Sequence, residues 1–237
     1  MKVSALVFAA GLGTRLYPLT ADRPKALVRY DGVPLLKIVL DKIIASGIHD
    51  VVVNVHHFPD QIIDFLKRQD FDARIQVSDE RAYLRDTAGG LKFAEHLFGE
   101  AQHILLYNVD ILSSLSIVDM VHQHLSSGAD ATLAVRQRKT SRYLVFDESN
   151  MRLRGWHNVS TGDTLGEVGF ENAVELAFSG IHVVRRELAR AIPSVEKQSL
   201  TPFYVHNADR LLINGYRHKD GEWMDVGKYS EYENVLS

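Results

Sequence analysis

Cysteine is absent from the 237 residues, and its absence removes several kinds of chemistry at once. Disulfide bonds, thiolate metal ligands and cysteine nucleophiles are excluded, while a reducing compartment is permitted. Long hydrophobic runs are also missing. The apolar stretch at residues 5–11 breaks into a glycine loop too early for a signal peptide, and no segment has the length of a membrane span. We therefore expect a soluble, cytoplasmic protein with no membrane partner.

Neither sign of charge dominates the chain. It carries 27 Lys and Arg against 30 Asp and Glu, a formal net charge of −3, so no basic field attracts nucleic acid or an anionic membrane. Hydrophobic residues make up 46% of the sequence, which at this length is enough for one sizeable core. We expect a single domain over residues 1–237 and no nucleic-acid partner.

Apolar runs and helical patterns alternate over the first 130 residues. Short continuous apolar runs predict buried strands at 3–9, 50–55, 74–78 and 103–110. Apolar residues at helical spacing predict helices at 34–47, 59–69, 87–99 and 116–128. This alternation is typical of βαβ units. The predicted fold class is α/β, a Rossmann-like, doubly wound and mainly parallel sheet with helices on both faces.

The pattern changes after Asp130. Closely spaced extended segments predict a smaller, partly antiparallel lobe that grows from the first sheet, at 130–137, 142–148, 151–157 and 174–184. We expect a loop at 161–172 and helices at 185–192, 201–215 and 228–236. The single domain thus has two halves, residues 1–129 and 130–237.

The segment "AAGLGTRLYPLTADRPKAL" joins the first strand to the first helix, at the carboxyl edge of the predicted parallel sheet. Ligands of open α/β sheets bind in the crevice at that edge. Gly11 and Gly13 let backbone N–H groups approach an anion closely, and Arg15 and Lys25 add two cations. We expect this loop to hold a polyphosphate, with Lys25 as a solvated cation.

Two better-known glycine loops do not fit this segment. A Walker loop needs G-x-x-x-x-G-K-[ST], which is missing here. A dinucleotide fingerprint needs a third glycine where the chain has Leu16, which disfavours a redox enzyme. The alternative for Gly11 and Gly13 alone is a tight turn, and the two cations nearby favour the anion site.

The pattern G-x-G-T-R, eight residues and P-K resembles the signature of the sugar-1-phosphate nucleotidyltransferases, also called sugar-nucleotide pyrophosphorylases. Further segments resemble that family in the right order over nearly the whole chain: "DTAGG" at 86–90, "NVD" at 108–110, "FSGI" at 178–181 and "WMDVG" at 223–227. The chain is most similar to short, single-domain members, such as the N-acetylmuramate-1-phosphate uridylyltransferases and short mannose-1-phosphate guanylyltransferases.

The resemblance implies a reaction and a set of site residues. The family transfers a nucleotidyl group from a nucleoside triphosphate to a sugar 1-phosphate, with Mg²⁺, and releases pyrophosphate. By resemblance the nucleotide contacts Ala10, Gly11, Gly13, Thr14, Glu80, Ala88, Gly89 and Gly90. The resemblance gives catalysis to Arg15 and Lys25, Mg²⁺ to Asp110 and Asp225, and sugar binding to Glu175, Gly180 and Trp223. The partly antiparallel half then becomes the sugar-binding lobe.

Each of these roles has a structural alternative. Asp110 caps a turn in the alternative reading, and Asp225 caps a last helix. Gly89 and Gly90 allow close helix packing, and Trp223 packs in the core. Four histidines, two after a strand and two at i, i+2 on a helix, are interpreted as structural: His56, His57, His122 and His124.

The sequence departs from the family pattern at three places. Val109 replaces the glycine that usually precedes the first metal aspartate, and Asp86 stands where many relatives have glycine. The Glu-Lys-Pro motif of larger members is missing, so Lys25, Arg142 or Arg154 is left to contact the sugar phosphate. The nucleobase stays open, with UTP slightly favoured, as do the sugar and the choice between monomer and homodimer. The alternative function is a non-catalytic sugar-nucleotide-binding module.

Overall fold

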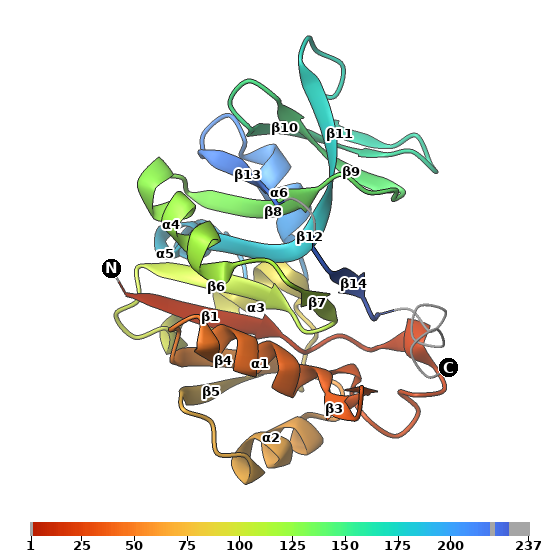
Figure 1. The fold of residues 1–237 in the computed structure, drawn as a ribbon, viewed down its shortest axis with the longest axis vertical. Coiled ribbons are helices and arrows are strands. Elements are labelled where there is room, and N and C mark those ends of the chain that lie inside the picture. Colours follow the sequence, from red (N-terminus) through yellow and green to blue (C-terminus); the bar gives the residue numbers. More distant parts are fainter. Residues whose placement is uncertain (1, 219–220, 228–237) are drawn as a thin grey trace.

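The computed structural model describes residues 2–218 and 221–227. One ten-stranded sheet runs along the molecule, in the order β11-β10-β13-β8-β12-β6-β1-β4-β5, and β9 pairs with both β10 and β12 (Figure 1). Four parallel strands form one end of the sheet: β1 (Val3–Phe8), β4 (Asp50–Val55), β5 (Arg74–Asp79) and β6 (His103–Asn108). All four predicted strands of the first half are present.

Helices cover both faces of this sheet, as the sequence predicts (Figure 1). The first half supplies α1 (Leu35–Ala45), α2 (Pro59–Arg68), α3 (Asp86–Ala94) and α4 (Ile117–Ser127), and the second half supplies α5 (Arg186–Ala191) and α6 (Leu200–His206). Neighbouring residues of β1 point to opposite faces. Leu6 packs in the core beneath α3, α5 and α6, and Val7 packs in the core beneath α1, α2 and α4. The sheet is therefore buried between two helical layers.

The second half continues the same sheet with mostly antiparallel strands. These are β8 (Ala131–Arg136), β9 (Arg142–Asp147), β10 (Arg152–Asn158), β11 (Thr164–Gly166), β12 (Ala173–Arg185) and β13 (Ile213–Arg217). β12 pairs with β6 through residues 181–185 and with β9 through residues 173–176. Gly180, at a φ of 76°, lies at the irregularity between these two stretches. β12 thereby carries the sheet from the parallel half into the lobe.

Two predicted elements of the second half differ in the structure. The expected loop at 161–172 contains β11, which pairs with β10 at Gly155 and Gly166, where neither residue has a side chain to obstruct the pairing. The helix predicted at 201–215 ends with α6 at His206, and β13 follows. The burial of β13 alternates with period two, a signal too short to outweigh the helical pattern before it. The helix predicted at 228–236 lies outside the described residues.

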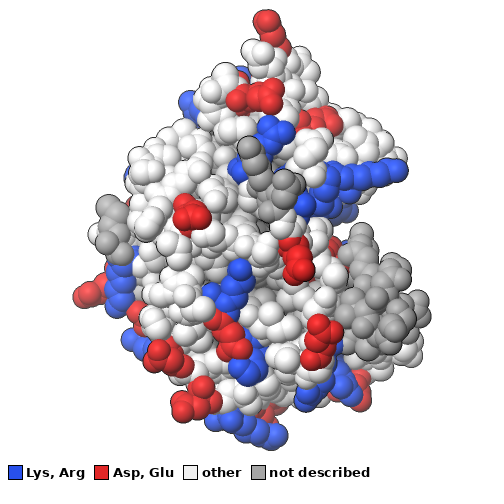
Figure 2. Space-filling view, in the orientation of Figure 1, with Lys and Arg blue, Asp and Glu red and all other residues white. Residues whose placement is uncertain are grey.

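Short elements complete the fold. Three single 3₁₀ turns are η1 (Thr14–Leu16), η2 (Lys25–Leu27) and η3 (Glu95–Leu97), and two small antiparallel pairs are β2 (Arg29–Tyr30) with β3 (Val33–Pro34) and β7 (Ile111–Ser113) with β14 (Trp223–Asp225). No helix in the described part of the chain is long and apolar enough to cross a bilayer. Lys, Arg, Asp and Glu are interspersed over the face shown in Figure 2, which fits the balanced composition.

His103 and His124 form a buried chain of polar contacts with Thr132. The His124 ring lies 3.0 Å from His103 and 2.9 Å from the Thr132 hydroxyl. Burial, together with the nearby His103 and Arg185, lowers the pKa of His124 to about 3. His124 is therefore a structural residue, neutral in the folded protein.

The neutral state of His124 makes stability depend on pH. Below its ordinary pKa of about 6.5 the unfolded chain binds a proton that the folded protein does not bind until near pH 3, so the free energy of unfolding falls as pH falls through this window. We expect His124→Gln to reduce this slope by about 1.4 kcal/mol per pH unit. Urea unfolding of both proteins at pH 7.5, 6 and 5 measures it. Parallel pH curves would show that His124 is not the source.

Candidate active site

The loop between β1 and α1 is shaped by two short turns. Gly13 has a φ of 67°, a left-handed conformation that favours glycine, and its carbonyl accepts a hydrogen bond from the Thr20 hydroxyl at 2.9 Å. η1 follows and places Thr14 and Arg15 on the exposed side of the loop. η2 begins at Lys25, directly after Pro24. The two predicted cations therefore lie on separate turns of one folded loop.

The start of this loop is fixed by Asn54, a residue that the sequence patterns did not single out. Its amide oxygen accepts hydrogen bonds from the backbone N–H groups of Ala9 at 2.7 Å and Ala10 at 3.2 Å. Its amide nitrogen donates to Glu80 at 2.8 Å. Asn54 lies in β4 opposite Phe8 of β1, at the last residue pair of the register between these two strands. A polar residue within the apolar run "DVVVNV" is the signal that could have found it.

Glu80 lies beneath the loop. Its side chain is buried, one carboxylate oxygen accepts from Asn54, and the other accepts from the backbone N–H of Arg85 at 3.3 Å. Burial raises the pKa of Glu80 above its ordinary value, and the Asn54 hydrogen bond opposes that shift. A Cβ on Gly90 would lie 2.9 Å from the Glu80 carboxylate, so the glycine allows α3 to pack here. Glu80 thus supports the loop through Asn54.

Two carboxylates from distant parts of the chain meet beside the loop. Asp110 directly precedes β7, and Asp225 ends β14, which pairs with β7 so that Asp225 lies opposite Ile111. The Val226 N–H also donates to the Asp110 carbonyl at 3.0 Å. The predicted pair of aspartates, 115 positions apart in the numbering, is therefore brought together by strand pairing.

Gly227 marks the point on which these groups converge. A Cβ built there would lie 2.6 Å from Asp110 Oδ2, 2.7 Å from Asp225 Oδ1 and 3.2 Å from a guanidinium nitrogen of Arg15. Hard carboxylate oxygens of this kind suit a divalent cation such as Mg²⁺. Within residues 2–218 and 221–227, no cluster of three or more acidic or histidine side chains suited to a metal occurs, so further ligands would come from substrate phosphates and water.

Lys25 lies in direct contact with this carboxylate pair. Its ammonium nitrogen donates to Asp110 Oδ2 at 2.6 Å, and the two side chains are only 14% and 11% exposed. The sequence predicted a solvated loop cation, and the structure corrects this to a largely buried ion pair. The correction has a simple cause. η2 turns the loop back toward the end of β6, a contact that no local pattern reports.

A cleft of about 370 Å³ opens at the carboxyl edge of the parallel strands. Four predicted residues line it: Ala10, Gly11, Lys25 and Asp110. Other residues lining it include Asn54, Asp86, Thr87, Asn108 and Lys197. A second cavity of about 200 Å³ shares Thr87 and Asn108 with the cleft and extends toward the lobe. Acidic and basic side chains therefore meet in the cleft, and a second cavity adjoins it.

Comparison with known proteins identifies the family of this chain. A family model described as nucleotidyl transferase matches residues 4–152. Over 233 residues the chain is 34% identical to an N-acetylmuramate alpha-1-phosphate uridylyltransferase of Caulobacter vibrioides, with 94% of this chain and 91% of that protein covered. The chain belongs to the nucleotidyl transferase family. The family and the enzyme class expected from the sequence are thereby confirmed.

More distant matches extend over the whole chain. A putative mannose-1-phosphate guanyltransferase of Sulfolobus acidocaldarius is 28% identical over 98% of this chain, which spans 62% of that longer protein. The solved structure of a putative glucose-1-phosphate thymidylyltransferase from Bacillus anthracis superposes with a TM-score of 0.81 at 16% identity, covering 98% of this chain and 93% of that one. HddC from Yersinia pseudotuberculosis, solved with GMP-PN, gives 0.77 at 20% identity, covering 99% and 98%. These structures confirm the predicted fold class.

Several residues that the family resemblance places at the nucleotide lie in packed surroundings. Ala88 is fully buried, and its N–H donates to the Gln198 carbonyl at 2.9 Å. Gly89 faces the Glu196 carbonyl so closely that any side chain would collide with it. Together with Gly90, they let α3 pack tightly, and the neighbouring Thr87 lines the cleft instead. Their contact with a nucleotide stays a prediction.

The three sugar-binding candidates occupy different places. Gly180 lines neither cavity, and a Cβ there would lie 2.6 Å from Ile111 and 3.1 Å from the amide of Asn108, which lines both. Glu175 lies on the lobe, 2.9 Å from the His157 ring, and lines neither cavity. The Trp223 ring donates its N–H to the Ser179 carbonyl at 3.0 Å and packs against the guanidinium of Arg138. Trp223 lines neither the cleft nor the second cavity. None of the three lines the cleft or the second cavity, and their contact with a sugar stays a prediction.

The structure also shows where the residues that depart from the family pattern lie. Val109 is fully buried in the core beneath α1, so it does not narrow the cleft. Arg154 pairs with Glu167 on the lobe, and neither it nor Arg142 lines the cleft. Lys197 does line it, although no sequence pattern marked that lysine as part of a site.

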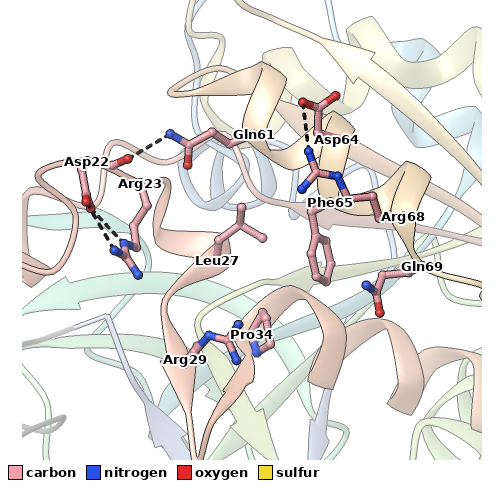
Figure 3. Close-up of a pocket in the computed structure, with 10 residues that line it drawn as sticks. All are labelled: Asp22, Arg23, Leu27, Arg29, Pro34, Gln61, Asp64, Phe65, Arg68 and Gln69. Atoms are coloured by element: carbon pink, nitrogen blue, oxygen red, sulfur yellow. Dashed lines mark hydrogen bonds and ion pairs between the residues drawn. The ribbon is translucent and has the colours of Figure 1, made fainter.

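A larger hollow of about 500 Å³ lies elsewhere, between α2 and the segment at Asp22–Leu27 (Figure 3). Two of its three arginines lie beside carboxylates: Arg23 pairs with Asp22, and Arg68 lies 3.9 Å from Asp64. None of the predicted site residues lines this hollow. We therefore place the candidate active site in the smaller cleft, where the charged groups converge.

Asn54 provides a test of how the loop is held. Asn54→Ala leaves two backbone N–H groups and the Glu80 carboxylate without their partner, each at a cost of roughly 1–3 kcal/mol when buried. We expect lower stability and weaker nucleotide binding, measured by urea unfolding and calorimetric titration. The control Asn158→Ala, in the lobe, also removes an amide oxygen that accepts a backbone N–H. Equal nucleotide affinity in both variants would contradict a role for Asn54 in shaping the loop.

Proposed function

We propose that this protein transfers a nucleotidyl group from a nucleoside triphosphate to a sugar 1-phosphate, giving a nucleotide-sugar and pyrophosphate. The observation that carries the proposal is the convergence of Asp110, Asp225, Arg15 and Lys25 at one end of the cleft. Two cations and two carboxylates from three segments of the chain form a centre suited to phosphates and a divalent ion. The names of the relatives support the same reaction.

The proposed reaction does not require a side chain to act as a general base. The attacking oxygen belongs to a phosphate monoester whose second pKa is about 6, so the nucleophile is already largely ionised at neutral pH. What the reaction requires is alignment of two charged substrates and stabilisation of negative charge as the α-phosphorus is attacked. Lys25 supplies positive charge at the cleft, and Arg15 supplies it beside Gly227, close to Asp110 Oδ2. The loop that begins at Ala10 supplies backbone N–H groups.

We propose that Asp110 and Asp225 hold Mg²⁺. Their oxygens face one small space in front of Gly227, and the donor set is purely oxygen, which Mg²⁺ prefers. When bound there, the ion would neutralise phosphate charge and orient the two substrates. Lys197, from the other side of the cleft, is the residue we assign to the sugar phosphate in place of the missing Glu-Lys-Pro lysine.

The second cavity is where we place the sugar. Its walls combine aliphatic and aromatic side chains, Leu133, Leu144 and Phe178, with the polar pair His182 and Tyr204. The His182 ring and the Tyr204 hydroxyl lie 2.8 Å apart, and burial lowers the pKa of His182 to about 3, so the pair is uncharged. Because the chain is similar to the N-acetylmuramate alpha-1-phosphate uridylyltransferase of Caulobacter vibrioides, we propose uridylyl transfer to an N-acetylated sugar 1-phosphate as the first reaction to test.

A substrate panel tests the proposed function directly. Pyrophosphate release is measured with UTP, GTP, CTP and dTTP, each against N-acetylmuramate, N-acetylglucosamine, mannose and glucose 1-phosphates. We expect one pair to react far faster than the others, with UTP the preferred nucleotide. Tight nucleotide-sugar binding without pyrophosphate release from any pair would instead favour a non-catalytic binding module.

The two aspartates should act as a unit. Asp110→Asn and Asp225→Asn each weaken the same charged centre, and losing an electrostatic stabiliser of this kind costs about 10²–10³ in rate. We expect the double variant to be little slower than the poorer single variant, and high Mg²⁺ to rescue each single variant in part.

The measurement is kcat for both single variants and the double variant at low and high Mg²⁺. Asp119→Asn, an exposed acid at the start of α4, serves as the control and should keep the rate of the unmodified enzyme. Multiplicative losses without magnesium dependence would mean that the two carboxylates do not share a metal.

A further inference from the structure

The contact between Lys25 and Asp110 has a consequence for the order in which ligands bind. The ammonium nitrogen lies 2.6 Å from Asp110 Oδ2, the same oxygen that faces the space in front of Gly227. Both side chains are nearly buried, so solvent screens the pair only weakly. The Asp110 carboxylate therefore already has a cation as its partner.

Four charged groups of opposite sign lie close together in this centre. Asp110 and Asp225 contribute two negative charges, and Lys25 and Arg15 contribute two positive charges within the same small region. A divalent ion that binds Asp110 Oδ2 must displace the ammonium of Lys25 from a short, partly buried contact. Two carboxylates without Lys25 would form a much stronger cation site.

We propose that Lys25 acts as an internal counterion that occupies the metal-binding carboxylate in the nucleotide-free enzyme, so that the metal binds tightly only together with the nucleotide. This inference rests on the proposed function. The arriving triphosphate supplies the negative charge that draws Lys25 away from Asp110. The released carboxylate then becomes available to the metal that accompanies the nucleotide. Lys25 is thus a positioning residue before it is a phosphate ligand.

The surroundings of Lys25 leave room for this exchange. Its ammonium nitrogen would lie 3.7 Å from a Cβ on Gly11, so the missing side chain keeps the cleft side of the lysine open. Lys25, Gly11 and Asp110 all line the same cleft. A lysine is a compact charge on a flexible stem, so rotation of its side chain alone moves the charge across several ångströms.

Manganese binding to the nucleotide-free protein tests the proposal without any turnover. Mn²⁺ affinity is measured by electron paramagnetic resonance for the unmodified protein, Lys25→Met and Lys25→Gln, with folding checked by circular dichroism. Because one opposite charge at this range changes cation affinity by a factor of ten or more, we expect both variants to bind Mn²⁺ at least about tenfold more tightly. With a non-hydrolysable triphosphate present, this gain should disappear.

Two further variants separate the proposal from a general charge effect. Lys37→Met removes a lysine that also pairs with an aspartate at 2.6 Å, on the exposed side of α1, and should leave Mn²⁺ affinity unchanged. Adding Asp110→Asn to Lys25→Met should remove the gain. The proposal is overturned if folded Lys25→Met and Lys25→Gln bind Mn²⁺ no more tightly than the unmodified protein, or if Lys37→Met shows the same gain.

The outcome is distinguishable from failure of the proposed function. Tighter Mn²⁺ binding by both Lys25 variants in a protein that reacts with no substrate pair would keep the counterion role and reject nucleotidyl transfer. Activity with unchanged Mn²⁺ affinity in the variants would do the reverse.

Discussion

The antiparallel pairing of β7 with β14 is the constraint on which the candidate active site depends. Only three residues of each strand take part, yet the pairing places Asp225 beside the residue that follows Asp110. Without it, the second carboxylate would lie in a separate segment near the end of the described chain. The backbone hydrogen bond from Val226 to the Asp110 carbonyl fixes the same approach from the other side.

Bringing two carboxylates together is unfavourable unless positive charge comes with them. The loop between β1 and α1 supplies this positive charge. Lys25 contacts Asp110, and Arg15 lies close to Gly227, where the two carboxylates converge. The loop in turn is held by Asn54, which is held by Glu80. A chain of contacts from a buried glutamate to a surface loop thus sets where the charges of the site lie. A triphosphate bound in the cleft would bring negative charge to the same groups.

Much of this architecture is readable from the sequence, because its signals are local. Continuous apolar runs mark the parallel strands, and helical spacing marks α1, α2 and α4. The change near Asp130 from alternating strands and helices to closely spaced extended segments marks the lobe. β11 and β13 were missed because strands of three and five residues carry too few positions for a period to stand out against a loop or a preceding helix.

The site was only partly readable, for a different reason. Arg15, Lys25, Asp110 and Asp225 could be selected by type and motif, and the structure brings them together. Which oxygen meets which nitrogen depends on strand pairing between residues far apart in sequence, and no spacing encodes it. Lys197 enters the cleft from a segment without regular structure, positioned by long-range backbone contacts. The motifs place Glu80, Gly89 and Gly90 at the nucleotide, which stays a prediction, and the structure shows that Glu80 is buried and that both glycines lie in tight packing contacts.

The central claim is that Asp110 and Asp225 form one cation site at the phosphate end of the cleft. A crystal structure with Mn²⁺ and a non-hydrolysable nucleoside triphosphate, with the metal located by anomalous scattering, tests it most directly. The account predicts one Mn²⁺ between the two carboxylates, with triphosphate oxygens on the same ion and Lys25 turned from Asp110 to a phosphate. A metal bound away from either aspartate, or a triphosphate seated in the hollow beside α2, would contradict it.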